Sequence, residues 1–177
     1  GSSYVGMTNL VSNAGVVATD VTAVGTARSG VGACEYGGDK GIFGFGYATT
    51  TDVSTTNLVS NTGVVGTDVT GVGTIRNALA ACGYGGDKGI MGYGDASGSQ
   101  TAVTNLVSNA GVVATDVTGV GTARTQIAAC EYGGDKGIFG FGTTGSVTGV
   151  TNLVSNAGVV ASDVTAVGTA RTQPAAC

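Results

Sequence analysis

The residues that could do chemistry in this sequence recur at a fixed spacing, beginning with a lysine in a glycine-rich segment. The segment YGGDKGI occurs at 36–42, 84–90 and 132–138 and carries Lys40, Lys88 and Lys136. Successive backbone N–H groups beside a lysine can bind an anion such as phosphate. A nucleotide-binding loop, however, leads directly into a helix, whereas here a glycine and a strand-like run follow the lysine. We interpret the segment as a tight turn between two strands with a solvated lysine.

A second recurring set combines an arginine with an aspartate eight residues before it. These charges could form a ring that faces a ligand. Alternatively, the planar five-donor guanidinium could hold the connections between units by hydrogen bonds to carbonyl oxygens or to an aspartate. One set per unit is what a structural brace requires, so we favour this second role. The expected brace residues are Asp20, Arg28, Asp68, Arg76, Asp116, Arg124, Asp163 and Arg171.

The sequence offers no pattern typical of a catalytic or metal site. It contains no histidine, which removes the commonest general base and the commonest metal ligand. A glycosidase needs one distinctive carboxylate pair, whereas these carboxylates repeat. Cys34, Cys82, Cys130 and Cys177 keep the repeat spacing without a C-x-x-C pair, and equivalent positions on successive units lie too far apart for a disulfide, so we expect buried thiols. We predict no enzyme, no catalytic residue, no cofactor and no metal.

The charge and the apolar runs of the sequence argue against nucleic-acid binding and against a membrane span. Only 10% of the residues are charged and the formal net charge is −4. Without a basic run, nucleic acid is an unexpected partner. No apolar run approaches the roughly 18 residues of a membrane-spanning helix, so we expect no membrane span.

All these residues belong to one repeated unit. The hexapeptide TNLVSN begins at Thr8, Thr56, Thr104 and Thr151, at intervals of 48, 48 and 47 residues. A period of this length is typical of repeat architectures. We expect a single repeat domain over 1–177, with units at about 1–27 (partial), 28–75, 76–123, 124–170 and 171–177 (partial).

Each unit is predicted to contain four strands and no helix, since glycine, threonine and valine fill every window. In the second full unit the strands are 78–84, 89–94, 104–109 and 112–118. Bulky residues such as Phe43 alternate with glycines, so one large and one small face are expected to pack between neighbouring sheets. Four short strands in about 48 residues are typical of a propeller blade.

The order of motifs in the unit points to a known family. Arg76 precedes the small apolar run ALAAC, the turn GGDK leads to GIMGYG, and Leu106 and Val113 stand seven residues apart. In this order the whole chain resembles Kelch repeats, where an aromatic residue and a tryptophan occupy the last two positions. The resemblance implies a β-propeller of four-stranded blades. The near-identical units are also similar to tandem Kelch-like repeats of structural proteins of phages and environmental microbes, which implies an extracellular or virion-surface location.

Two arrangements of the units remain open. In one, about four blades form a ring that residues 171–177 and 1–27 close by pairing in one blade, which would remove exposed sheet edges. In the other, the chain is a segment of a longer propeller or of a β-solenoid. Pro174 stands where other units have Val31, Leu79 or Ile127, and proline suits a terminal or edge strand because it lacks the ladder N–H. This favours the closed ring.

The loops that differ between units are the expected partner sites. They span 47–55, 95–103 and 143–150, and the candidate contact residues are Tyr47, Thr50, Asp52, Asp95, Ser97, Gln100, Thr143 and Thr144. We expect a non-catalytic structural protein that self-associates, or binds other structural proteins, in an extracellular filament, fibre or virion-associated assembly. The alternative is a recognition module that binds a glycan or a protein through these loops.

Overall fold

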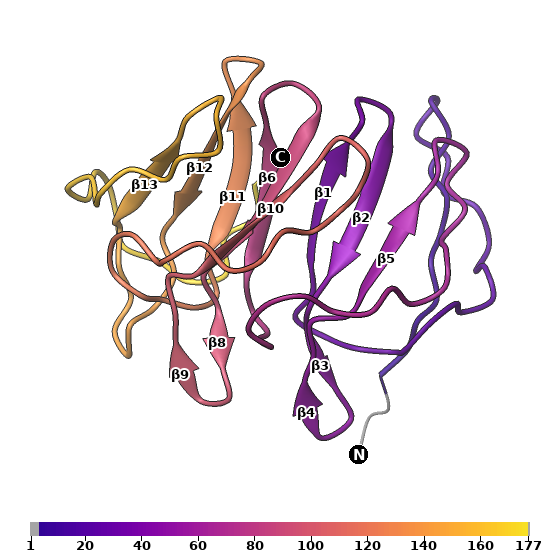
Figure 1. Ribbon diagram of the computed structural model, residues 1–177, viewed down its shortest axis with the longest axis horizontal. Helices are drawn as coiled ribbons and strands as arrows, with labels where there is room; N and C mark the ends of the chain where they lie inside the picture. Colours follow the sequence, from indigo (N-terminus) through magenta and orange to yellow (C-terminus); the bar gives the residue numbers. More distant parts are fainter. Residues whose placement is uncertain (1–3, 177) are drawn as a thin grey trace.

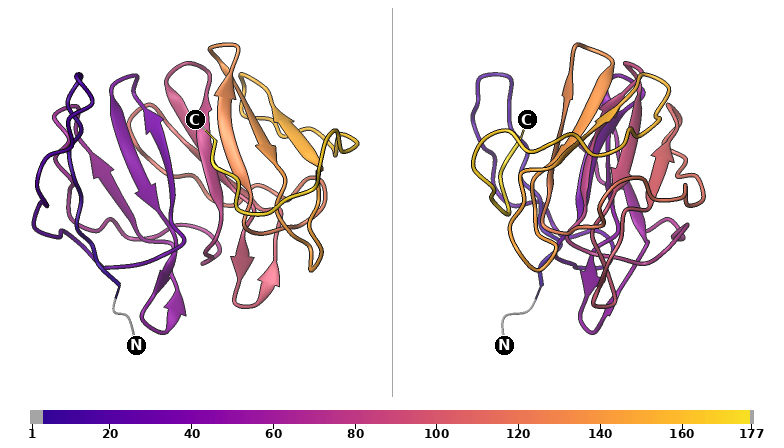
Figure 2. Two further views of the ribbon diagram at one scale, coloured as in Figure 1. Left: turned by 180° about the vertical axis from the view of Figure 1, so that it is seen from behind. Right: turned by 90° about the vertical axis from the view of Figure 1, so that its left-hand side faces the viewer.

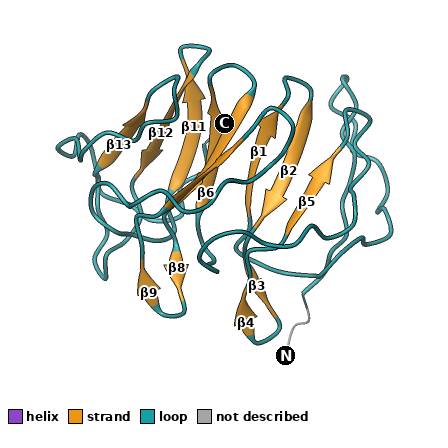
Figure 3. Ribbon diagram, viewed as in Figure 1, coloured by secondary structure: helices purple, strands orange, loops and turns teal. Residues whose placement is uncertain are grey.

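The computed structural model describes residues 4–176, and this part of the chain consists of strands and loops without a helix (Figures 1 and 3). Sheet 1 contains β1 (Gly32–Tyr36), β2 (Lys40–Gly44) and β5 (Thr56–Val59). Sheet 2 contains β6 (Ala80–Tyr84), β7 (Lys88–Gly92) and β10 (Thr104–Val107). Sheet 3 contains β11 (Ala128–Tyr132), β12 (Lys136–Gly140) and β13 (Thr151–Val154). The expected all-β class is confirmed.

Two short hairpins lie outside these sheets and follow the second strand of sheets 1 and 2. They pair β3 (Tyr47–Ala48) with β4 (Thr51–Asp52), and β8 (Asp95–Ala96) with β9 (Ser99–Gln100). Both hairpins project from the same edge of the molecule, the lower edge in Figure 1. They fall in the variable loops of the sequence.

All three sheets share one antiparallel register, so they are copies of one unit. The cysteine of the first strand lies opposite the isoleucine of the second in every sheet: Cys34 and Ile42, Cys82 and Ile90, Cys130 and Ile138. In the connecting turn of sheet 1, Gly37 and Gly38 have φ of 64° and 77°. That left-handed conformation costs other residues about 1–2 kcal/mol. The YGGDKG segment is therefore a hairpin turn.

The fourth strand expected in each unit does not join the sheets as a regular strand. In sheet 1 it meets β5 only at two isolated bridges, Thr56 with Val69 and Val59 with Val65. Between these bridges β5 advances three residues (56 to 59) while the other segment advances four (65 to 69). The extra residue is a bulge that interrupts the ladder. The same three-against-four spacing recurs beside β10 and β13, so the sheets are three-stranded.

Neighbouring sheets pack face to face, large side chains against glycines. A Cβ built on Gly44 of sheet 1 would lie 2.7 Å from Met91 Sδ of sheet 2. A Cβ on Gly92 of sheet 2 would lie 2.9 Å from Phe139 Cζ of sheet 3. Met91 and Phe139 are fully buried. The core therefore lies between the sheets, and the glycines permit this close approach.

The expected closure of a ring by residues 171–177 with 1–27 is not found in the described parts of these segments. The N-terminal segment (4–27) lies against sheet 1, where Thr26 N–H donates to Asp68. The C-terminal segment (169–176) lies on sheet 3, where Gln173 N–H donates to the Gln126 carbonyl, 2.9 Å away. No hydrogen bond joins the two segments among residues 4–176. The sheets form an open row whose two ends are visible from behind in Figure 2.

Candidate functional site

The repeated arginines occupy the joints between successive sheets, and Arg76 shows the arrangement in full. Its side chain is completely buried. Its Nε donates to the Tyr93 carbonyl (2.9 Å), one terminal nitrogen to the Thr74 carbonyl (3.0 Å), and the other to Asn105 Oδ1 (2.7 Å). The guanidinium also stacks on Phe45 of sheet 1, 4.1 Å from the ring centroid. One side chain thus connects sheets 1 and 2 with the loop around Thr74. This loop leads into sheet 2, and we call it and its equivalents entry loops.

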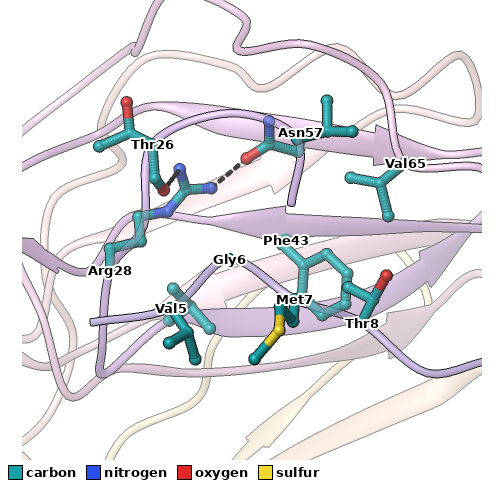
Figure 4. Close-up of a pocket in the computed structure, with 11 residues that line it drawn as sticks. Val5, Gly6, Met7, Thr8, Thr26, Arg28, Phe43, Asn57 and Val65 are labelled. Carbon is teal, nitrogen blue, oxygen red and sulfur yellow. Dashed lines mark hydrogen bonds between the residues drawn. The ribbon is translucent and has the colours of Figure 1, made fainter. Parts of the chain in front are cut away.

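Arg124 and Arg28 occupy the equivalent places in sheets 3 and 1. Arg124 is fully buried, donates to the Phe141 carbonyl (2.9 Å) and to Asn152 Oδ1 (2.6 Å), and stacks on Tyr93 at 4.5 Å. Arg28 donates to Asn57 and to the Thr26 carbonyl, as Figure 4 shows. Because these contacts repeat from unit to unit, they belong to the architecture and not to one ligand site.

Asp68, Asp116 and Asp163 complete the brace, and each acts on the arginine about 40 residues before it rather than on the one eight residues after it. Arg28 lies 3.7 Å from Asp68, and Arg124 lies 4.0 Å from Asp163. Asp68 accepts hydrogen bonds from Thr26 N–H, from Thr26 Oγ1 (2.7 Å) and from Asn57 Nδ2 (2.8 Å). The aspartate reaches this arginine because the fourth segment folds back onto the loop that leads into its own unit.

The electrostatics of the brace follow from the complete burial of Arg76 beside the more exposed Asp116. Burial lowers the pKa of Arg76 to about 10, and the negative charge of Asp116 opposes this change. Arg76 therefore stays protonated at neutral pH. Burial alone would raise the pKa of Asp116, but hydrogen bonds from Thr74 and Asn105 and the charge of Arg76 hold it below its ordinary value.

Two residue types of the brace were missed at the sequence level. They are the asparagine of TNLVSN and the threonine two residues before each arginine: Asn57, Asn105, Asn152, Thr26, Thr74 and Thr122. Both types recur in step with the arginine. That repetition was the available signal, although it does not say which side chain points inward.

At the two ends of the row the brace has only half of its residues in place. Asp20 accepts a hydrogen bond from Asn9 Nδ2 (2.8 Å), and no arginine lies beside it in the described chain. Arg171 is exposed, stacks on Phe141 at 3.7 Å and donates to the Thr169 carbonyl (3.2 Å).

The lysines of the YGGDKG turns pair with the aspartate that precedes them. Lys40 Nζ lies 2.6 Å from Asp39, and Asp39 also accepts from Asn61 at 3.1 Å. The turn is used structurally as well, because Gly37 N–H donates to the Asp87 carbonyl in the next unit's turn, 2.7 Å away. With its lysine paired and this N–H taken, the Lys40 turn lacks the arrangement that an anion site needs.

The candidate loop residues divide between exposed and structural positions. Thr50, Ser97, Gln100 and Thr144 are exposed, and Tyr47, Asp95 and Thr143 are half-buried. Asp52 is buried, and accepts hydrogen bonds from Asn77 Nδ2 (2.6 Å) and Ser97 N–H (2.8 Å). Asp52 therefore joins the first hairpin to the second and is not available to a partner.

The cysteines of the described chain are free thiols, and Cys34 and Cys82 face a glycine of the next sheet, Gly89 and Gly137. Burial raises the pKa of Cys34 and of Cys82 to about 12. Cys177 lies outside the described residues. Residues 4–176 contain no group of three or more acidic or cysteine side chains placed to bind a metal.

A cavity of about 230 Å³ separates the N-terminal segment from sheet 1. Figure 4 shows Val5, Met7 and Phe43 around it, with Arg28 at one side. Met91 and Phe139, the residues equivalent to Phe43, are each covered by the preceding sheet. Phe43 has only Val5 and Met7 of the N-terminal segment on that side. The cavity is a loosely filled joint at the end of the row.

No helix in the described chain is long and apolar enough to span a membrane. No protein-family model matches the chain, and the search of curated proteins finds no match.

Proposed function

We propose that this chain is a non-catalytic structural protein whose repeated units build an extracellular filament, fibre or virion-associated assembly. The observation that carries the proposal is the repetition of one joint along the chain. Arg76 and Arg124 are fully buried in equivalent networks between consecutive sheets. Such joints let identical units be added one after another, with each unit contacting only its neighbours.

The recurring charges support a structural role over a catalytic one. Asp68, Asp116 and Asp163 accept several hydrogen bonds each from the brace. The Asp39, Asp87 and Asp135 carboxylates pair with adjacent lysines. Carboxylates engaged in the same way in every unit do not form one distinctive acid–base pair.

For the finer architecture we propose an arc of a Kelch-like propeller with four-stranded blades. In this proposal the bulged segment that meets β5, β10 and β13 at isolated bridges would count as the fourth, irregular strand of each blade. The blades pack large residues against small ones, as propeller blades do. A longer propeller, or a β-solenoid, is the alternative arrangement of the same units.

The structural role is tested by imaging the purified 177-residue chain by negative-stain microscopy and measuring its mass by light scattering. We expect particles larger than one chain, with a mass that rises with concentration. A uniform monomer at every concentration would contradict an assembly role.

The variable loops support a second candidate, a recognition module for a glycan or a protein. Thr50, Ser97 and Gln100 are exposed on the two hairpins that project from one edge (Figure 1). Hydroxyl and amide groups are suited to the polar surface of a glycan. Binding on a glycan array that is lost in a Gln100→Ala variant, with an unchanged thermal unfolding midpoint, would support this candidate. A flat array with folded protein would count against glycan binding.

A further inference from the structure

The same apolar contact occurs at each of the three joints inside the row. A leucine of one unit lies against a glycine of the next: Leu10 with Gly63, Leu58 with Gly111, and Leu106 with Gly158. A Cβ on Gly111 would lie 2.8 Å from Leu58 Cδ2, and one on Gly158 would lie 2.9 Å from Leu106 Cδ2. A tyrosine joins the contact, because the same positions lie 2.9 Å from Tyr36 and from Tyr84. The two joints between sheets thus have a leucine–tyrosine half and a glycine half, whereas the contact of Leu10 with Gly63 has the leucine alone.

Each end of the row carries one half without the other. Tyr132 and Leu153 of sheet 3 are each 39% exposed, whereas the equivalent Tyr36 and Tyr84 are 5% exposed. These three tyrosines have the same place in the repeat, so what differs is the covering unit. At the opposite end, a Cβ built on Gly15 would have no described atom within 4 Å.

The polar side chains at the two ends of the row also complement each other, donors at one end and acceptors at the other. In each internal unit the threonine and arginine of the entry loop donate to an asparagine and an aspartate, as Thr122 and Arg124 do to Asn152 and Asp163. The sheet 3 end carries the donors Thr169 and Arg171. The sheet 1 end carries the acceptors Asn9 and Asp20, which are bonded to each other.

The exposed donor is held in the orientation that the internal joints use. Arg171 stacks on Phe141 of sheet 3, as Arg124 stacks on Tyr93 of sheet 2 and Arg76 on Phe45 of sheet 1. The Arg171 guanidinium therefore already has its aromatic partner. What it lacks, compared with Arg76 and Arg124, is an asparagine and an aspartate to accept its hydrogen bonds.

We propose that two copies of this chain join head to tail. Leu153 and Tyr132 of one copy would cover Gly15 of the other, while Thr169 and Arg171 donate to its Asp20 and Asn9. The proposal rests on the structural role above and names its partner, a second copy. The joint uses different surfaces on the two copies, so repetition gives a closed ring if the rotation closes and a filament if it does not.

The test blocks each end separately and then mixes the blocked proteins. Leu153→Asp blocks the sheet 3 end, and Val112→Asp is its control, since Val112 is 64% exposed in an internal unit. Gly15→Glu blocks the other end, and Gly38→Glu is its control, because both glycines have positive φ (75° and 77°) and open space around the Cβ position. Mass is measured by sedimentation velocity in reducing buffer.

We expect each end-blocked variant to be a monomer and both controls to assemble as the unaltered chain does. An equimolar mixture of Leu153→Asp and Gly15→Glu should give one dimer and nothing larger, because the pair retains one open end of each kind. Arg171→Glu, which changes a residue outside the sheets, should also block assembly and should form the same dimer with Gly15→Glu.

Three outcomes would overturn the joint, and they are distinguishable. If the unaltered chain and the end-blocked variants assemble equally, the joint is wrong while a structural role survives. If the unaltered chain is a monomer at every concentration, the ends do not join copies and the structural role fails as well. A mixture that stays monomeric while the unaltered chain assembles would also refute head-to-tail pairing.

Discussion

Replacing Arg76 by methionine is the most direct test of the brace. Methionine keeps much of the apolar stem of arginine but removes all of its donors. Asn105 Oδ1 and the Tyr93 carbonyl would then lose the hydrogen bonds they accept at 2.7 and 2.9 Å. The stack on Phe45 would be lost as well. Arg171→Met is the matched control, because Arg171 is exposed and the one hydrogen bond that its side chain makes within the described chain goes to the Thr169 carbonyl.

The two substitutions should differ several-fold in their effect on the free energy of unfolding. Each buried acceptor left unpaired costs about 1–3 kcal/mol, and a desolvated cation–π contact contributes about 1–2 kcal/mol. The desolvation that lowers the pKa of Arg76 offsets part of this. We expect a loss of about 3 kcal/mol for Arg76→Met. For Arg171→Met the exposed stack alone predicts about 0.5–1 kcal/mol.

Urea unfolding at neutral pH and low protein concentration, followed by far-UV circular dichroism, measures both effects. With a denaturant slope of about 2 kcal/mol per molar, the midpoint should fall by about 1.5 M for Arg76→Met and by less than about 0.5 M for Arg171→Met. Equal shifts for the two variants would refute the reasoning, because the brace would then add no stability beyond an exposed contact.

Three further predictions follow from the same structure. Lys40→Ala should change the unfolding free energy by less than about 0.5 kcal/mol, since exposed ion pairs contribute little; Phe139→Ala should cost about 3–5 kcal/mol, and similar urea midpoints for the two would contradict this. Cys34 and Cys82, whose pKa burial raises to about 12, should resist maleimide at pH 8 until urea unfolds the chain, so that rapid labelling at either of these two positions in the native protein would show that it is accessible. The lowered pKa of Asp116 means that its charge stabilises the fold above the unfolded-state pKa, near 4, and that this stabilisation is lost as pH falls through the folded-state pKa. The difference in urea midpoint between the unaltered chain and Asp116→Asn should therefore shrink below about pH 4, and a difference independent of pH would contradict this.

Local patterns in the sequence predicted the strands and turns well. The YGGDKG turn, the TNLVSN strand and the small apolar strand that contains Cys82 all lie where the pattern of glycine, β-branched and bulky residues places them. Such features depend on neighbouring residues in the chain, and three nearly identical copies make them easier to recognise. The arginines could be identified in the same way, because one per unit keeps a fixed place in the repeat.

The fourth strand was predicted less well, because a bulge depends on side chains from another strand. Asn57 Nδ2 donates to the Gly66 carbonyl at 3.1 Å and to Asp68 at 2.8 Å. These side-chain hydrogen bonds accompany the extra residue between the two bridges. The β-branched run by itself gives no indication of this extra residue.

The sequence by itself determined the unit, its all-β character and the arginines and aspartates of the brace, because these follow from periodicity and from local backbone preference. Only the tertiary structure decided which partners meet and which residues are covered. Arg28 meets Asp68 and not Asp20, and Asp52, which looked like a loop residue for partners, is buried. Tyr36 and Tyr132 are the same residue in the same motif, yet one is 5% and the other 39% exposed. Burial depends on what lies across space from a side chain, and identical units differ there at the ends of the row.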